Sequence, residues 1–219
     1  DLQTEDSAST ALKKQNGTYS ELTGNYGFTF DQRDKAFMPT SGSIVSFGQS
    51  IPIAADKAFI ENTISSSFYK SLSENIVGST KIYLASINGL GGEDVRISKR
   101  RGISSSRLRG FEKNKVGPVD GSDHVGGNYV AALNFETNLP NVLPENSNAD
   151  VGLFLDFGNV WGVDYDSSID ESNKIRSSTG VTVNWLSPIG PLNFVISQNL
   201  SKADSDVTES FTFNLGTTF

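Results

Sequence analysis

The sequence contains no cysteine and a single histidine among its 219 residues. Without cysteine, the chain cannot form a disulfide, act through a thiol nucleophile or hold zinc in a cysteine site. The one histidine, His124, excludes a metal site built from several histidines, and its place in a predicted loop does not favour a Ser-His-Asp arrangement. No other motif indicates catalysis, so the sequence predicts a protein that is not an enzyme and that uses no metal or cofactor.

Long apolar runs and an excess of positive charge are also missing. No stretch approaches the roughly 18 to 20 apolar residues that a membrane-spanning helix requires, which excludes a helical membrane protein. The net charge is −7, and basic residues cluster only at 99–101 and at Arg107 and Arg109, so we expect no nucleic-acid partner. A soluble domain or a β-barrel remains, because the signal of each barrel strand is weak.

Apolar and polar residues alternate along much of the chain, and a period of two is typical of strands with two different faces. This pattern predicts about nine strands, at residues 21–31, 43–52, 58–72, 80–90, 129–136, 151–158, 181–185, 192–197 and 210–219. The run at 80–90 is the least regular, since Ile82 and Leu84 interrupt the alternation. The sequence therefore predicts an all-β protein with antiparallel strands.

The faces of these strands differ in composition. One face carries large apolar residues, and the other carries glycine, serine, threonine, asparagine and acidic residues, which suit a wet barrel lumen better than a packed core. Connections near 74–78 and 188–190 are short, whereas those at 91–126 and 161–175 are long, as expected of a transmembrane barrel with two unlike rims. Periodicity alone leaves open a soluble sandwich in which the apolar face points inward.

Three segments follow from this pattern. Residues 1–17 are polar and form a predicted loop or tail, with one helical turn near Leu12. Residues 18–219 form the barrel domain, and the interval 91–126 is its longest loop. Loops of that length inside a compact domain are usually functional or disordered. Because the chain begins at Asp1 without an initiator methionine, we expect a mature product or an excised fragment.

Two carboxylates are predicted to face the lumen together. With the apolar faces outward, Glu136 and Asp156 both point inward from consecutive strands. Neighbouring carboxylates repel each other and favour a shared cation, and the planar fork of arginine can serve both. Arg109, in a loop long enough to reach the lumen, is the candidate. The alternative is that both acids are simply solvated lumen groups.

Several motifs resemble those of the BamA family of bacterial outer-membrane assembly factors, in the wider superfamily of BamA, TamA and two-partner-secretion transporters. Leu108-Arg109-Gly110-Phe111 is similar to the (V/I)RGF motif of the family's long sixth extracellular loop. Others follow in the same order, namely residues 36–42 (AFMPTSG), 126–128 (GGN), 155–161 (LDFGNVW), 185–192 (WLSPIGPL) and 211–219 (FTFNLGTTF). The resemblance covers most of the chain.

The resemblance implies a fold and a set of site residues. The family barrel has sixteen strands preceded by periplasmic domains, so this chain would be its C-terminal portion, with the long loop folded inward. The motif residues Arg109, Gly110 and Phe111 would then form a loop latch with Glu136 and Asp156. The last strand resembles the β-signal by which outer-membrane barrels are recognised, through Phe211, Phe213, Leu215, Gly216 and Phe219.

The resemblance also implies a function without chemical catalysis. The chain would be the barrel portion of an insertase that folds and inserts β-barrel proteins, and it would be integral to the bacterial outer membrane. Its partners would be client outer-membrane proteins, the lipid bilayer and accessory lipoproteins reached through the missing periplasmic domains, and open sheet edges would permit self-association. The alternative function is a passive pore or protein-secretion transporter with the loop as a plug.

Overall fold

The computed structural model of the chain describes residues 3, 5, 9–36, 38–139, 142–144, 147–171, 173–188 and 190–215. Its long strands are β1 (Glu21–Asp31), β2 (Gly42–Ala55), β3 (Phe59–Ser71), β4 (Val77–Gly89), β7 (Tyr129–Leu139), β8 (Ala149–Trp161), β9 (Arg176–Ser187) and β10 (Gly190–Ser201). Shorter elements are α1 (Thr10–Lys13), η1 (Ile97–Lys99), β5 (Val119–Asp120), β6 (Asp123–His124), η3 (Ser167–Ile169) and β11 (Phe211–Leu215).

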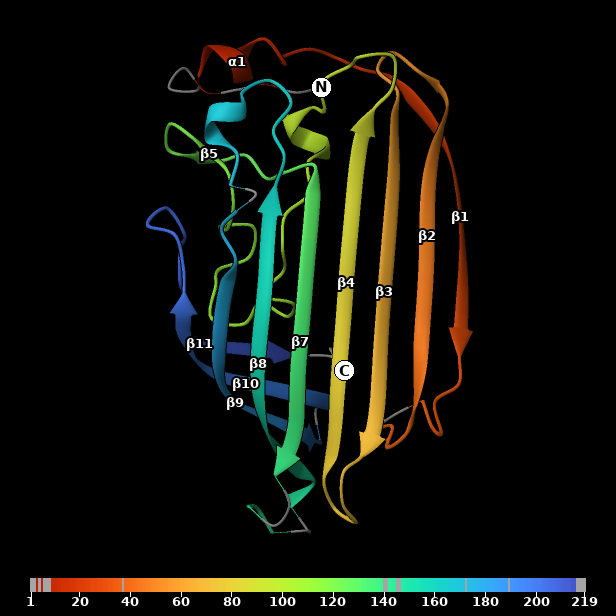
Figure 1. The fold of residues 1–219 in the computed structure, drawn as a ribbon, viewed down its shortest axis with the longest axis vertical. Helices are drawn as coiled ribbons and strands as arrows, with labels where there is room; N and C mark the ends of the chain where they lie inside the picture. The colour runs from red at the N-terminus through yellow and green to blue at the C-terminus, as the bar shows by residue number, and fades with distance from the viewer. Residues whose placement is uncertain are drawn as a thin grey trace.

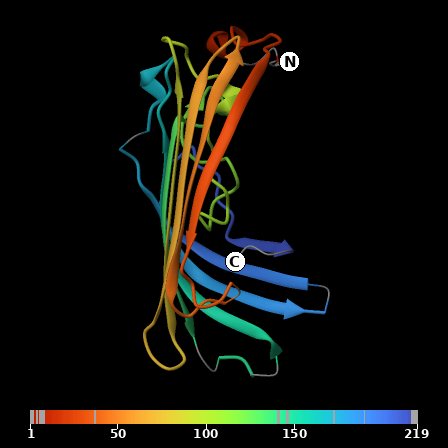
Figure 2. The same ribbon diagram turned by 90° about the vertical axis from the view of Figure 1, so that its right-hand side faces the viewer.

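In the part of the chain that the structure describes, nine strands form one antiparallel sheet, which confirms the predicted number and the all-β class. Their order is β1-β2-β3-β4-β7-β8-β9-β10-β11, so every strand lies beside its neighbours in the sequence, while β5 and β6 form a separate small hairpin. Figure 2 shows the sheet from its side: it curves, β9 to β11 turn away from β1 to β4, and the connection between β4 and β7 lies on the concave side. The predicted alternative, a sandwich, is wrong, because the described long strands share a single sheet.

Pairing between strands fixes which residues share a face. Asn134 pairs with Asp156, and Glu136 pairs with Phe154, so these side chains lie on the concave side as predicted. The convex side carries the apolar row, and many of its large side chains are exposed. Among them are Phe28, Phe30, Ile64, Phe68, Leu84, Phe135, Leu153, Val181, Trp185, Ile196 and Phe213. Exposed apolar surface of this extent marks a membrane or protein contact.

The irregular pattern of β4 has a structural reason. Its residues Ile82 and Leu84 face the convex side, whereas Ala85 and Ile87 are buried on the concave side, so both of its faces are apolar. Ala85 packs in a core cluster with the concave-side residue Val130 and with apolar loop side chains. The small and polar residues predicted for the inward face therefore line only part of the concave side, because the inserted loop packs apolar side chains against the rest.

A bulge extends β2 beyond its predicted end. The prediction stopped at Pro52, and proline lacks the N–H that a central strand needs. In the structure β2 continues to Ala55, and the register with β1 shifts so that Ile53 is the extra residue. The pairing of β2 with β3 ends at Ser50 and Glu61, so Pro52 lies where β2 has a neighbour on one side only.

The N-terminal segment joins the long-loop rim of the sheet (Figure 1). The predicted helical turn is α1, in which Leu12 is 2% exposed and packs against Val125 and Val163. The side-chain oxygen of Gln15 accepts a hydrogen bond of 2.7 Å from the backbone N–H of Ile97. Described residues 9–17 thus cover the long loop rather than hanging free.

Both ends of the sheet are open in the described part of the chain. There β1 pairs only with β2, and β11 pairs only with β10. The last strand was predicted over 210–219, and its described portion is β11; Gly216 and Phe219 lie outside the described residues, as does Phe37 of the 36–42 motif. None of the helices described is long and apolar enough to cross a membrane.

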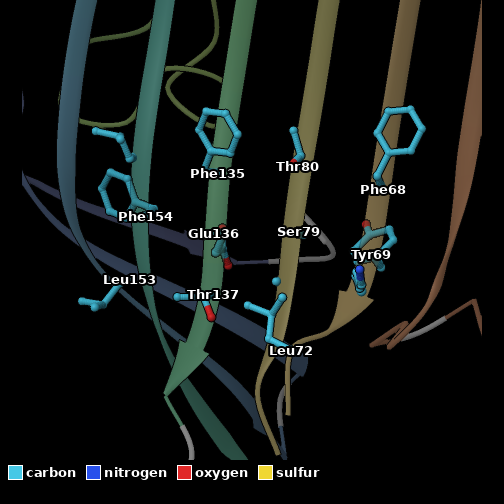
Figure 3. Close-up of a pocket in the computed structure, with 13 residues that line it drawn as sticks. Phe68, Tyr69, Leu72, Ser79, Thr80, Phe135, Glu136, Thr137, Leu153 and Phe154 are labelled. Carbon is cyan, nitrogen blue, oxygen red and sulfur yellow. The ribbon is translucent and has the colours of Figure 1, made fainter.

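The convex face has a shallow apolar hollow of about 540 Å³ near the short-turn rim. Figure 3 shows Phe68 and Phe135 on either side of the small Thr80, with Leu72 and Leu153 below. The hollow arises because Thr80 and Gly78 are small residues between large ones on the neighbouring strands. The unequal sizes of the outward-facing side chains thus account for the hollow.

Two glycines on the concave face differ in how closely the long loop packs against them. A Cβ atom at Gly158 would lie 2.9 Å from Cδ1 of Ile103 and 3.3 Å from Cδ1 of Leu108, both in the long loop. We expect Gly158→Val to displace the loop and to cost about 1–3 kcal/mol of stability, as overpacking usually does. Faster tryptic cleavage after Arg107 in folded protein would report the displacement.

Gly48 provides the matched control, because it lies on the same face of β2 and no atom lies within 4 Å of a Cβ built there. Gly48→Val should leave the cleavage rate unchanged. Equal cleavage of both variants would contradict the packing described for the loop.

Candidate functional site

The connection between β4 and β7 turns inward and brings its own apolar side chains with it. Leu108 is fully buried and Phe111 is 1% exposed, and both belong to a cluster with Val130 and Val160 of the concave face. These two residues flank Arg109 and Gly110, so packing on either side holds the arginine at a fixed depth.

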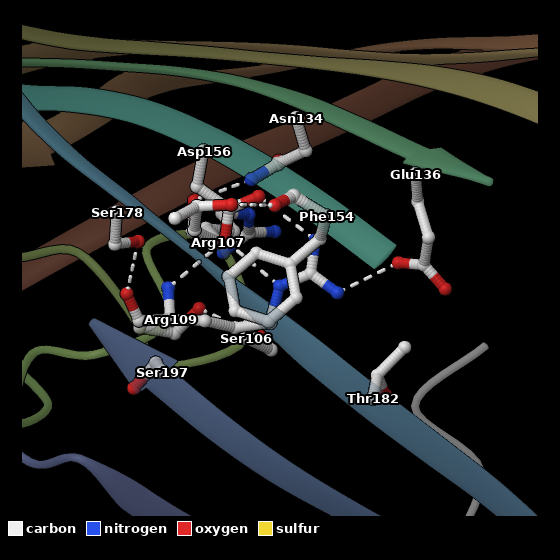
Figure 4. A network of polar contacts seen from close by, with 12 residues as sticks. Ser106, Arg107, Arg109, Asn134, Glu136, Phe154, Asp156, Ser178, Thr182 and Ser197 are labelled. Atoms are coloured by element: carbon white, nitrogen blue, oxygen red, sulfur yellow. Dashed lines mark hydrogen bonds and ion pairs between the residues drawn. The ribbon is translucent and has the colours of Figure 1, made fainter. Parts of the chain in front are cut away.

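Arg109 binds both predicted carboxylates (Figure 4). Its Nε and Nη2 atoms each donate to Asp156 at 2.8 Å, a two-pronged contact, and its Nη1 donates to Oε2 of Glu136 at 2.7 Å. The backbone N–H of Arg109 also donates to Asp156, at 3.1 Å. The structure therefore brings together the three charged residues that the sequence pointed to.

The surroundings of the guanidinium favour its charged form. Burial by itself would lower the pKa of Arg109, but the hydrogen bonds to Asp156 and the charges of Asp156 and Glu136 outweigh it, so the pKa is raised. The Phe154 ring lies beneath the guanidinium, with its centroid 3.8 Å from Cζ. A cation over an aromatic face is stabilised further when water is excluded.

Residues that the sequence did not identify complete the network. Ser178 on β9 donates its hydroxyl to the carbonyl oxygen of Arg109, and Asn134 on β7 donates to the carbonyl of Arg107 at 2.8 Å. The guanidinium of Arg107 lies 3.5 Å from the centroid of the Tyr83 ring on β4. Small polar residues at inward positions were the only sequence signal for these contacts, and many other positions share it.

Gly110 adopts a backbone conformation that other residues rarely reach, with φ of +89°. A Cβ there would also lie 3.1 Å from Oγ of Ser197 and from Nδ2 of Asn199. The Gly110 carbonyl accepts a 2.8 Å hydrogen bond from that Asn199 amide. Phe111 then forms a backbone bridge with Thr208. The glycine of the motif thus allows close approach to β10.

A second buried arginine centre lies near the long-loop rim. Arg176 is fully buried, and all five of its N–H donors have acceptors. Nε and Nη2 donate to the two oxygens of Asp206 at 2.9 Å each, Nη2 also donates to Glu171, and Nη1 donates to Asn159 at 2.7 Å and to the Lys174 carbonyl at 3.0 Å. No motif or alternation in the sequence pointed to this centre.

Ion pairs join the first part of the long loop to strands β1 and β3. Arg101 contacts Glu61 on β3 at 2.5 Å, and Lys99 contacts Glu21 on β1. These side chains are partly exposed, and such pairs typically contribute little, about 0–1 kcal/mol. The buried Arg109 contacts and the apolar cluster around Leu108 and Phe111 therefore dominate the attachment of the loop.

The predicted β-signal residues lie apart from Arg109. Phe211, Phe213 and Leu215 alternate outward along β11, each more than half exposed, and the Phe213 ring contacts that of Phe194 at a centroid distance of 5.1 Å. Their partner strand is β10, whose Asn199 also contacts the motif glycine. The two groups of predicted residues are thus linked through one strand.

Beside Arg109 and Glu136, the concave face opens into a hollow of about 730 Å³. It is lined by Arg109 and Glu136 at one end and by polar groups such as Lys81, Asn184 and Asn193. No three described carboxylate or histidine side chains converge as metal ligands would. The hollow thus presents polar side chains beside the Arg109 contacts.

The difference in burial between the two carboxylates predicts unequal costs of removing them. The Asp156 side chain is fully buried, whereas that of Glu136 is 21% exposed and borders the hollow. Asp156→Ala should lower the free energy of unfolding by about 3–5 kcal/mol, because it leaves a buried charge with half its partners. Glu136→Ala should cost about 1 kcal/mol, since water can replace it.

Denaturant titration of the folded protein in detergent would measure both losses. Arg101→Gln, which removes a partly exposed loop ion pair, is the control and should match Glu136→Ala. If Asp156→Ala were no more destabilising than the control, the buried contact would not hold the loop.

Comparisons with known proteins identify the family of the chain. A family model described as the Omp85 superfamily domain matches residues 1–219. The outer membrane protein assembly factor BamA of Neorickettsia risticii is 26% identical over 98% of this chain, and that of Nitratidesulfovibrio vulgaris is 29% identical over 98%. The chain spans 30% and 28% of the length of these two relatives.

A solved structure shares the fold. The crystal structure of BamA from Haemophilus ducreyi lacking POTRA domains 1-3 matches with a TM-score of 0.80 and 24% sequence identity, over 86% of this chain and 41% of that chain. The curved, open sheet therefore has the fold of part of that barrel, as the motifs predicted. With a family match over its whole length and the fold to accompany it, the chain belongs to the Omp85 superfamily.

Proposed function

We propose that this chain forms the barrel portion of an outer-membrane protein assembly factor. Such a factor folds other β-barrel proteins and inserts them into the outer membrane. The observation that carries the proposal is the free edge of β11, a strand paired on one side only in the described chain, held next to a loop anchored inside the sheet. The names of the two relatives support the same activity.

The β11 edge has what a template for an incoming strand requires. An unpaired strand presents a row of N–H and C=O groups that another extended segment can bond. Its outward residues Phe211, Phe213 and Leu215 would adjoin the outward residues of the added strand. Because backbone groups make the bonds, such an edge accepts clients of different sequence. Strand pairing replaces chemical catalysis in this proposal.

The charged residues of the loop latch, Arg109, Glu136 and Asp156, hold the loop in place while this happens. The latch ties the loop to β7 and β8, and Gly110 ties it to β10, the strand that carries β11. A fixed loop keeps the concave side filled and the sheet curved, so the edge of β11 stays in one position. The latch thus has a structural role in this proposal, and the client strand pairs at the β11 edge.

The proposed setting is the bacterial outer membrane. The convex apolar row faces lipid, client barrel proteins meet the β11 edge, and accessory lipoproteins act through periplasmic domains outside this chain. The free edge of β1 offers a second site for strand addition, which includes self-association with another copy.

Arg109→Ala separates assembly from passive conductance. Loss of the latch frees the loop from β7 and β8, so client folding should slow several-fold while planar-bilayer conductance changes little. Client folding would be followed by heat-modifiability of a reporter barrel in cells, per amount of folded variant. Arg107→Ala is the matched control, because its guanidinium contacts the Tyr83 ring and makes no ion pair in the described chain.

The opposite pattern would contradict the proposal. A large rise in conductance with unchanged client folding would identify the loop as the plug of a passive pore or secretion transporter.

A further inference from the structure

The connection from β10 to β11 is held along almost its whole length. Residues 203–209 begin with a tight turn in which Asp206 accepts from the backbone N–H of Ala203 at 2.6 Å. Nε2 of His124, in the long loop, donates to the Ser205 carbonyl at 3.0 Å. These contacts leave the connection little conformational freedom.

The long loop pairs with this connection through backbone bonds. The N–H of Glu112 donates to the Val207 carbonyl at 3.0 Å, and the N–H of Val207 donates to the Lys115 carbonyl at 3.1 Å. The N–H of Glu209 donates to the Gly110 carbonyl at 3.1 Å. The loop that carries the motif is therefore paired with the residues that lead into the last strand.

Arg176 fixes the same connection from the other side. Its fork holds both oxygens of Asp206, and the side chains of both residues are fully buried. Charged hydrogen bonds of this geometry are directional as well as strong. Because Arg176 is the first residue of β9, the contact ties the connection to the body of the sheet.

The sequence of β11 cannot fix its own register. Its described part has five residues, with Phe211, Phe213 and Leu215 outward and Thr212 and Asn214 inward. A slip of two residues keeps every side chain on its face. It would place Phe213 opposite Ile196 instead of Phe194, an apolar contact in either case. Such a slip would move the free edge by about 7 Å along β10.

We infer that Arg176 and Asp206 are positioning residues that set the register of β11 on β10, and so the place where a client strand can add. The pairing of 207–209 with the long loop completes this positioning. The consequence for clients rests on the proposed function, but the register itself does not.

Disulfide cross-linking measures the register directly, and the chain has no cysteine of its own. Ile196→Cys with Phe211→Cys joins register partners, whereas Ile196→Cys with Phe213→Cys reports a two-residue slip. A disulfide requires Cα atoms about 4.4–6.8 Å apart, which only direct partners satisfy. Cross-links would be scored in the outer membrane on the protein as the cell makes it, in its folded, heat-modifiable form.

Asp206→Asn is the test variant, because it keeps the shape of the side chain and removes its charge. We expect the partner cross-link to fall several-fold and the slipped cross-link to appear. Arg176→Lys keeps the charge without the fork and should act in the same direction. The control is Arg101→Gln, which removes a loop ion pair to β3 and should change neither yield.

An unchanged ratio of the two cross-links in Asp206→Asn would overturn the inference. So would the absence of any folded form, since the centre would then serve folding rather than register. Client folding is followed in the same cells: a register shift that leaves client folding unaffected would contradict the proposed function and leave the positioning role standing.

Discussion

A guanidinium shared between two neighbouring strands is the contact on which the concave side depends. Arg109 and Asp156 could not be buried separately, because an isolated charge in an apolar interior costs far more than a folded protein can offset. Together they satisfy each other, and the apolar residues on either side exclude water. The loop, the two acidic strands and the serine on β9 therefore form one unit.

The concave face is divided by this unit. Toward the long-loop rim it is dry, because Leu108, Phe111 and their neighbours pack against it. Toward the short-turn rim it is polar, and Asn193 donates a hydrogen bond to Asn184. Glu136 stands at the boundary, with one oxygen on Arg109 and its flank toward the hollow. The inward-facing residues thus line an apolar cluster toward the long-loop rim and a polar hollow toward the short-turn rim.

The sequence allowed much of this to be predicted, for a physical reason. Side chains in a strand alternate between faces, so the position of Asp156 relative to Leu155 decided which way it points. Contacts between loops carry no such period. Arg176 could have met Asp204, Asp206 or Glu209, and only the path of the connection decides among them. The continuation of β2 past Pro52 likewise depended on the absence of a neighbour on one side, which pairing reveals and composition does not.

The distances in sequence that the loop bridges have a kinetic meaning. Arg109 meets Asp156 across 47 residues and Ser178 across 69, and Gly110 meets Asn199 across 89. Contacts of high sequence separation form slowly, because a large loss of chain entropy precedes them. The strands that supply these partners must be paired before the loop has anything to bind. We therefore expect docking of the loop to follow the pairing of β8, β9 and β10, the strands that supply these partners.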